Sequence, residues 1–190
     1  ADRFQRPWAG IVGQPVDMDL SDSLGLTRPQ GVVIAQLHPL SPFAAAGLQV
    51  GDVVLAVDGR PVNTPPEMLF RMSVRGIGED ARITYARAGR EIETDVAMIA
   101  PPDSPPRAEA VIPERGVLPG LRLAKANPAV ASELGLPLTA SGVVVLDPGR
   151  YGARVGLQTG DILRAVDGVP VETPGQVDRL LRRAAPGVAI

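Results

Sequence analysis

Few side chains in this sequence could carry out acid–base or nucleophilic catalysis. The 190 residues contain one histidine, His38, and no cysteine, which excludes disulfides and thiolate chemistry. A Ser–His–Asp arrangement would have to use His38, but the nearby Ser41 directly precedes Pro42 and is typical of a helix N-cap. We therefore predict that His38 is a surface loop residue, that no residue is catalytic, and that the chain itself is not an enzyme.

Four aspartates recur in two similar stretches of the chain. Asp52 and Asp161 each follow a glycine at the start of a predicted strand, and Asp58 and Asp167 each precede a glycine in a predicted hairpin turn. Aspartate is common at such positions for structural reasons, and we favour that role over acid–base work. The sequence has no GxxxxGK[ST] phosphate loop and too few histidines for a zinc-hydrolase helix. We expect no cofactor and no metal.

The remaining chemistry lies in the backbone near the N-terminus, where apolar residues flank a glycine just before a predicted strand. Successive N–H groups in such a turn can point at one anion. If the strand keeps an unpaired edge, an extended peptide can add to it, with its terminal carboxylate against the turn. The sequence predicts a carboxylate-binding loop at Trp8, Ala9, Gly10 and Ile11, followed by a strand whose free edge could pair with a peptide.

A helix is predicted over residues 65–75, with Thr64 as its N-cap and proline at its first position. Met68, Leu69 and Met72 could form an apolar pocket on this helix for the terminal side chain of a peptide, since methionine adapts to several shapes. The same spacing is typical of a helix packed into a core. Both interpretations remain open from the residues alone.

These features require a small sheet flanked by short helices. We predict strands at 9–16, 31–37 and 52–57, helices at 20–26, 41–46 and 65–75, and a hairpin of 82–87 with 90–98. In the last strand Ile92, Thr94, Val96 and Met98 alternate with acidic residues. The predicted fold class is mostly β with short helices (α+β), arranged as a partial barrel or sandwich.

The chain contains this module twice. Residues 47–62 and 156–171 are identical at 11 of 16 positions. We predict a linker remnant at 1–6, a first domain at 7–99, a Pro-rich linker at 100–113 and a second domain at 114–190. Nothing in the second copy corresponds to the final hairpin of the first. We therefore expect the second domain to be truncated, or completed by a strand from elsewhere, such as another chain.

The second copy has its own counterparts of the predicted site. They are Leu118, Gly120 and Leu121 in the loop, and Val177, Leu180 and Leu181 on the long helix. The loop also contains Pro119, which has no N–H to donate. We therefore favour an adaptor or inter-subunit role for the second copy over carboxylate capture.

Composition excludes several other classes of function. The formal net charge is −2, without a basic stripe that would indicate nucleic-acid binding. No apolar run approaches the length of about 20 residues that spans a bilayer, and no signal-peptide core is present. Apolar residues make up 45% of the chain, which is typical of a folded domain.

The repeated motif resembles a known family. The runs SPFAAAGLQVGDVVLAVDGRPV (41–62) and RYGARVGLQTGDILRAVDGVPV (150–171) are similar to bacterial PDZ domains. Residues 8–26 and 31–42 resemble the first PDZ domain of HtrA/Deg-type serine proteases. This resemblance implies a periplasmic or cell-envelope location and a trypsin-like protease domain in the same polypeptide. It also implies homo-oligomer contacts through PDZ domains. The family's peptide-pairing strand matches Ile11, Val12 and Gly13, and its carboxylate loop and helix wall match the loop and helix positions named above.

The function expected from residues and resemblance together is capture of C-terminal or exposed apolar segments of unfolded proteins by strand addition, as a regulatory region of an HtrA-like endopeptidase. An alternative is a PDZ pair from another envelope protein, such as a site-2 metalloprotease or a secretion scaffold. A stand-alone enzyme is a third class, which the single histidine and the absence of cysteine argue against.

Overall fold

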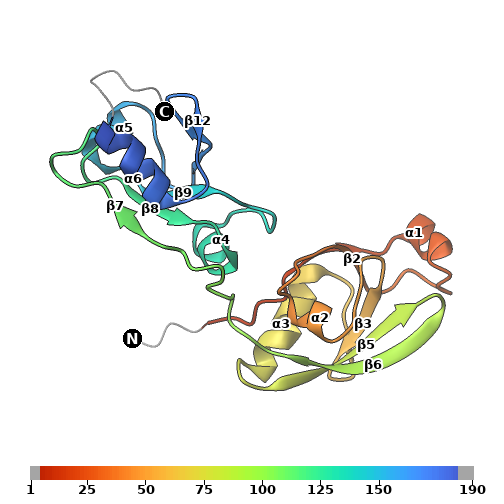
Figure 1. The fold of residues 1–190 in the computed structure, drawn as a ribbon. Helices are drawn as coiled ribbons and strands as arrows, with labels where there is room; N and C mark the ends of the chain where they lie inside the picture. Colours follow the sequence, from red (N-terminus) through yellow and green to blue (C-terminus); the bar gives the residue numbers. More distant parts are fainter. Residues whose placement is uncertain (1–4, 184–190) are drawn as a thin grey trace. The chain divides into compact units, whose positions relative to one another are not determined.

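The computed structural model describes residues 5–183 and divides the chain into two compact units, 1–101 and 102–190. Each unit is an open sheet with short helices (Figure 1). The expected fold class is confirmed, although the sheets do not close into partial barrels. The ends of the predicted linker remnant and second domain, 1–4 and 184–190, lie outside the described residues. No helix within 5–183 combines the length and apolar character needed to cross a bilayer.

The first unit is built around a sheet with strand order β1-β2-β3-β5-β6, and β4 pairs with β3 beside this path. All pairings are antiparallel. The strands are β1 (Ile11–Pro15), β2 (Val32–Leu37), β3 (Val53–Val57), β4 (Arg60–Pro61), β5 (Asp80–Arg87) and β6 (Arg90–Ala97). The helices are α1 (Met18–Ser23), α2 (Pro42–Ala45) and α3 (Pro65–Arg75).

Local capping explains the helix bounds. Helix α3 spans the predicted residues, because Thr64 Oγ1 accepts the Glu67 N–H and Gly76 follows with φ +88°. Helix α1 begins earlier than predicted because the Asp17 side chain caps it by accepting the Leu20 N–H. It also ends before Gly25, so the predicted span 20–26 is wrong at both ends.

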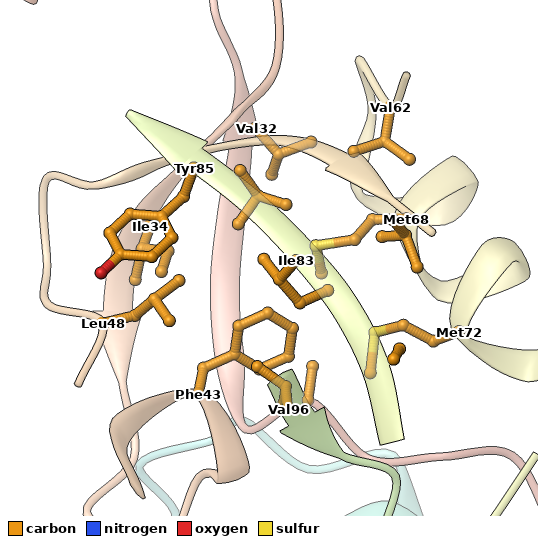
Figure 2. Packing of buried hydrophobic residues seen from close by; sticks show 14 of the residues in the cluster. Val32, Ile34, Phe43, Leu48, Val62, Met68, Met72, Ile83, Tyr85 and Val96 are labelled. Atoms are coloured by element: carbon orange, nitrogen blue, oxygen red, sulfur yellow. The ribbon is translucent and has the colours of Figure 1, made fainter. Parts of the chain in front are cut away.

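The core of the first unit lies between the sheet and helices α2 and α3. Phe43, Met68, Met72 and Ile83 are almost completely buried in one cluster (Figure 2). The apolar side chains of β6 alternate as predicted, with Val96 buried and its neighbours exposed. Such burial contributes about 1.5–3 kcal/mol for each large side chain.

The second unit repeats part of this plan. Its four-stranded sheet has the order β10-β9-β8-β7, and a separate hairpin pairs β11 with β12. The strands are β7 (Ala110–Val111), β8 (Arg122–Lys125), β9 (Val143–Asp147), β10 (Ile162–Leu163), β11 (Ala165–Val166) and β12 (Val169–Pro170). The helices are α4 (Pro128–Leu134), α5 (Gly149–Arg154) and α6 (Pro174–Arg183).

The linker predicted at 100–113 is largely part of the second unit. Strand β7 lies inside it and pairs with β8, and Ile112 is 2% exposed in the core of that unit. The Ala129 N–H also bonds to the Pro102 carbonyl. The proline content predicted an extended linker. The prediction is wrong for Ala110–Ile112, because this apolar run pairs with β8 and Ile112 packs into the core.

Candidate functional site

The loop of residues 8–11 holds its carbonyl groups toward the protein. The Ser41 hydroxyl donates to the Ala9 carbonyl at 2.5 Å, and the His38 N–H donates to the Gly10 carbonyl at 2.8 Å. Each peptide unit is planar and trans, so its N–H points opposite to its C=O. The N–H groups of Gly10 and Ile11 therefore point away from these two partners. Among residues 5–183, no hydrogen bond is donated by the backbone of Ala9 or Gly10.

Glycine is needed in this loop because the backbone is tightly packed there. Gly10 has φ +66°, and an added Cβ would lie 2.7 Å from the Trp8 ring and 2.9 Å from the Ser41 Cβ. The Trp8 ring packs edge-on against His38, with ring centroids 5.4 Å apart, and the backbone N–H of Trp8 donates to the Ile99 carbonyl. These contacts hold the two outward N–H groups in a fixed position, as an anion-binding turn requires.

Strand β1 follows the loop and forms one end of its sheet. It pairs with β2 on one side, and its other edge has no partner strand within residues 5–183. Ile11 packs against the core, while Val12 is 38% exposed. An unpaired edge beside outward N–H groups can accept an extended peptide chain.

Helix α3 lies along this strand. A Cβ added to Gly13 would be 3.4 Å from Pro65 of α3, which places the start of the helix beside β1. Leu69 lies four residues after Pro65, on the same face of the helix, and is 39% exposed. We call the Gly10 and Ile11 N–H groups, the free edge of β1 and Leu69 the β1 edge site.

Two of the predicted pocket residues do not line an accessible surface. Met68 is 1% exposed and Met72 is fully buried, and both belong to the core (Figure 2). Of the three predicted side chains, Leu69 alone can contact a peptide without rearrangement. The spacing of the methionines therefore reflects core packing, and they support the helix from behind.

His38 and Ser41 are structural in this arrangement. The Ser41 hydroxyl bonds to the Ala9 carbonyl and also accepts the Phe43 N–H, as the predicted N-cap of α2. His38 Nδ1 accepts the Leu40 N–H at 3.0 Å, and partial burial lowers the pKa of the imidazole. Both side chains hold the loop and its neighbouring turn in place.

The repeated aspartates have the structural roles predicted for them. Asp52 accepts the Gln49 N–H at 2.7 Å, and Asp161 accepts the Gln158 N–H at 2.9 Å. Asp58 and Asp167 occupy the left-handed region, with φ of 49° and 51°, in the two hairpin turns. Asp and Asn tolerate this conformation better than most residues.

In the second unit the predicted site residues are mostly buried. Gly120 is exposed at its loop, whereas Leu118, Leu121, Val177 and Leu181 are at most 6% exposed and form one core cluster, with Leu180 at its margin. The Gly120 N–H donates to the Ile112 carbonyl at 2.9 Å. Sequence reasoning missed Ile112, which it placed in the linker. The apolar run Ala110–Ile112 between polar residues and Pro113 was the available signal.

Comparison with known proteins identifies both units. Two family models, each described as PDZ domain, match residues 12–98 and 142–190. A relative from Halomonas elongata, named probable periplasmic serine endoprotease DegP-like, is 34% identical over 93% of this chain and 37% of its own length. A relative of the same name from Brucella suis is 30% identical over 95% of this chain and 35% of its own length. The chain thus spans about a third of these relatives.

Solved structures of HtrA-type proteases also resemble the chain. A structure described as HtrA-type protease AlgW with decapeptide is 26% identical, with a TM-score of 0.46, and covers 52% of this chain and 30% of its own. The HtrA3 PDZ domain bound to a phage-derived ligand is 20% identical, with a TM-score of 0.42, and covers 49% of this chain and 85% of its own. From the two matching models and the shared order of elements, the chain belongs to the PDZ family, with one PDZ domain in each unit.

Proposed function

We propose that the first PDZ domain binds C-terminal or exposed apolar segments of unfolded proteins at the β1 edge site. The bound segment adds to β1 as an antiparallel strand, and its terminal carboxylate accepts from the Gly10 and Ile11 N–H groups. The observation that carries this proposal is the pair of pinned carbonyls, Ala9 and Gly10, which aims both N–H groups outward.

The chemistry of the site accounts for both affinity and selectivity. Hydrogen bonds to a charged carboxylate contribute about 1.5–3 kcal/mol each, more than those between neutral groups. Backbone pairing along β1 adds affinity that does not depend on ligand sequence. Leu69 and the partly buried Ile11 supply an apolar surface for the last side chain of the ligand. A ligand with an apolar C-terminal residue and a free carboxylate fits all three features.

The names of the relatives support a wider context for this binding. We propose that the two PDZ domains form a regulatory region of a periplasmic HtrA-like serine endopeptidase, which delivers bound segments to a protease domain of the same polypeptide. Hydrolysis itself would then take place outside these two domains. The support is the DegP-like name shared by relatives that match 93% and 95% of this chain.

A peptide titration tests the binding proposal. The probe is a labelled decapeptide ending in valine with a free carboxylate, compared with the same peptide carrying a C-terminal amide. We expect Leu69→Asp to weaken binding of the free-carboxylate peptide about ten-fold or more, because a carboxylate replaces the apolar contact and repels the ligand terminus. Val74→Asp is the matched control, since Val74 is 71% exposed on the same helix and lies away from β1.

The amidated peptide should bind more weakly than the free acid to the unmodified protein, because it lacks the full charge at the outward N–H groups. Amide shifts of Gly10 and Ile11 would locate the interaction. Equal binding of both peptides, or equal effects of the two aspartate substitutions, would contradict the assignment of the β1 edge site.

A further inference from the structure

The edge of β8 in the second domain already carries an added strand. Strand β8 begins directly after Gly120-Leu121, and β1 begins at Ile11 directly after Gly10, so the two strands are counterparts. On the edge of β8 away from β9, β7 pairs in antiparallel register, with Ala110 opposite Leu123 and Val111 opposite Arg122. The position that is free in the first domain is therefore occupied here by the chain's own residues.

The end of this added strand makes the contacts that a ligand terminus would make. The Ile112 N–H donates to the Leu121 carbonyl at 2.9 Å, and the Gly120 N–H donates to the Ile112 carbonyl at 2.9 Å. Gly120 is the counterpart of Gly10, whose N–H points outward for a carboxylate in the first domain. The carbonyl of Ile112 thus takes the place of a ligand carboxylate oxygen.

The Ile112 side chain also fills the apolar position beside the helix. It is 2% exposed and belongs to one cluster with Leu118, Leu121, Val177 and Leu181. Helix α6 contacts β7 as well as β8. Val111, between Ala110 and Ile112, is 56% exposed. This alternation is that of a bound peptide whose last residue is buried and whose preceding residue faces solvent.

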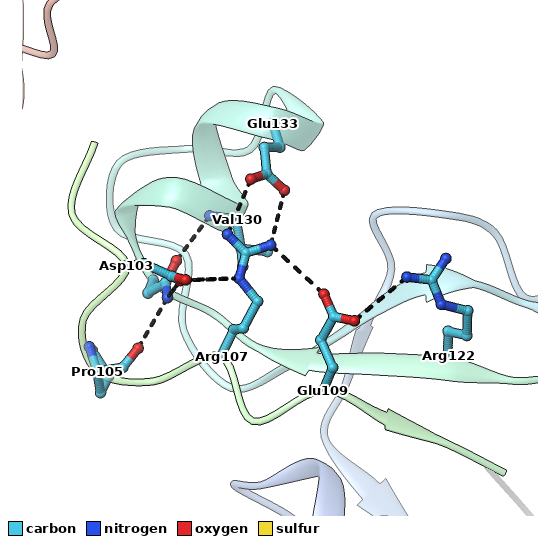
Figure 3. Close-up of polar contacts among 8 residues, drawn as sticks. Asp103, Pro105, Arg107, Glu109, Arg122, Val130 and Glu133 are labelled. Carbon is cyan, nitrogen blue, oxygen red and sulfur yellow. Dashed lines mark hydrogen bonds and ion pairs between the residues drawn. The ribbon is translucent and has the colours of Figure 1, made fainter. Parts of the chain in front are cut away.

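A polar cluster holds the segment just before β7. Arg107 bonds to both carboxylate oxygens of Glu133 on α4, at 3.0 and 3.1 Å, and to Asp103 at 3.0 Å (Figure 3). The Arg107 carbonyl accepts the Lys125 N–H of β8 at 2.6 Å. The bonds to Glu133 come first in raising the pKa of the Arg107 guanidinium. The segment is thus tied to α4 and β8 before it reaches the site.

Two further contacts complete this cluster. The Asn127 amide donates to Asp103 and to the Pro105 carbonyl, while its own oxygen caps α4 at Val130. That amide, followed by Arg107, lowers the pKa of Asp103. Glu109 bridges Arg107 and Arg122 at 3.7 and 3.5 Å (Figure 3). We call Asp103, Arg107, Glu109, Asn127 and Glu133 the Arg107 cluster.

We propose that residues 109–112 are an intramolecular ligand of the second PDZ domain, held in place by the Arg107 cluster. The site they cover accepts an extended peptide with a branched apolar C-terminal residue, such as one ending in Ala-Val-Ile. An external peptide binds only after this segment is displaced. The inference does not depend on peptide binding by the first domain, because its contacts all lie within residues 102–183.

The short connection makes the internal segment a strong competitor. Only residues 113–119 separate Ile112 from Gly120, so the effective concentration of the segment at its site is on the order of millimolar or higher. The apparent affinity of an external peptide falls in proportion to the fraction of open sites. Weakening the Arg107 cluster should raise that fraction and expose the site.

The test uses the whole chain and follows amide NMR signals. The probe is a decapeptide ending in Glu-Ala-Val-Ile with a free carboxylate. Signals of Gly120 and Leu123 report the second domain, and signals of Gly10 and Ile11 report the first. We expect Arg107→Ala to tighten binding at the second domain about ten-fold, since it removes several charge-assisted bonds from the covering segment. Arg164→Ala, at an exposed arginine outside the cluster, is the matched control.

A second variant locks the segment instead of releasing it. The bond from Ile112 to Leu121 makes residues 111 and 122 a non-hydrogen-bonded pair, in which side chains are closest. Because the chain has no cysteine, Val111→Cys/Arg122→Cys can form one defined disulfide. We expect the oxidised form to lose all peptide binding at Gly120 and Leu123, and the reduced form to regain it.

Two results would overturn the proposal. If the oxidised and reduced forms bind the peptide equally at Gly120 and Leu123, the segment does not cover the site. If Arg107→Ala speeds amide exchange in β7 and β8 but gains no binding there, the segment is a permanent strand and not a displaceable ligand. The Gly10 and Ile11 signals report the first domain in the same titration, so failure of one proposal is distinguished from failure of the other.

Discussion

In the first PDZ domain the outer edge of β1 has no partner strand among the described residues 5–183, and the Gly10 N–H points outward. In the second, the edge of β8 carries β7 and the Gly120 N–H bonds to Ile112. The two domains nevertheless share 11 of 16 residues in their central motif, together with its capping aspartates and left-handed turns. The shared residues build the turns around β3 and β10. The pairing of the edge that we propose binds peptides depends on residues that precede this motif in each domain.

The two copies thus keep the same turns and strands but differ in whether the edge beside the loop is paired. In the first domain Trp8 begins the loop and packs edge-on against His38, and no strand within residues 5–183 pairs with the outer edge of β1. The segment before the second loop is apolar at Ala110–Ile112 and turns back along β8. An internal duplication can therefore yield one open and one occupied binding edge through a change of a few residues.

The largest expected difference between the two loops comes from their glycines. An added Cβ at Gly10 would lie 2.7 Å from the Trp8 ring, while at Gly120 its nearest neighbour would be the Gly149 Cα at 3.9 Å. Both have positive φ, which costs about 1–2 kcal/mol for alanine. We expect Gly10→Ala to destabilise its domain by about 2–4 kcal/mol, and Gly120→Ala by about 1–2 kcal/mol.

Urea unfolding of each variant measures this difference. Trp8 is the one tryptophan and reports the first domain, and amide exchange of β8 and β9 reports the second. Equal losses at the two glycines would show that the packing around the first loop is no tighter than around the second, which would remove the reason for its fixed N–H groups.

Local signals predicted much of this fold. Thr64, Pro65 and Gly76 fix the bounds of α3 through capping and a positive φ, and Asp58-Gly59 sets a hairpin turn, so each could be predicted from a few adjacent residues. The loop around Gly10 was likewise predicted from a few adjacent residues. The spacing of residues on α3 could not distinguish the exposed Leu69 from the buried Met68 and Met72, because burial depends on how α3 packs against the sheet.

The strand β7 shows where sequence reasoning fails. It is two residues long, too short for an alternating pattern to be recognised, and it lies between Pro105 and Pro113 in a proline-rich stretch. The segment before it is held by the partly buried Arg107 and its exposed partners Glu133 and Asp103, three charges that form no recognisable sequence motif. Three-dimensional contacts alone reveal that these residues act together.

A smaller difference is expected at the two capping aspartates. Asp52 is 3% exposed and receives two bonds from Arg87, at 2.9 and 2.7 Å, besides the Gln49 N–H. The hydrogen bonds to Asp52 come first in raising the pKa of Arg87. Asp161 caps its own turn in the same way but has no arginine partner within residues 5–183.

We therefore expect Asp52→Asn to lower the urea midpoint of the first domain more than Asp161→Asn lowers that of the second. The amide keeps the acceptor for the turn but loses the charge that Arg87 pairs with. Arg87→Gln should reproduce most of the Asp52→Asn effect, and the double variant should cost little more than either single one. Additive losses would show that the ion pair does not contribute to the difference between the domains.

The smallest effect distinguishes the turns that follow β2 and β9. In the first domain His38 Nδ1 accepts the N–H of Leu40, two residues on, and in the second the Asp147 carboxylate accepts the N–H of Gly149 in the same way. Burial lowers the pKa of His38 below its ordinary value of 6.5, so the unfolded chain binds the proton more tightly than the folded one. Its stabilising contribution is complete above pH 6.5 and declines as the pH falls through the lowered pKa.

Because His38 is the one histidine, the urea midpoint reported by Trp8 should fall slightly between pH 7 and pH 5.5. His38→Asn retains an acceptor for Leu40 but cannot titrate, so it should remove this part of the pH dependence; a midpoint that changes equally in both proteins would assign the effect to carboxyl groups instead.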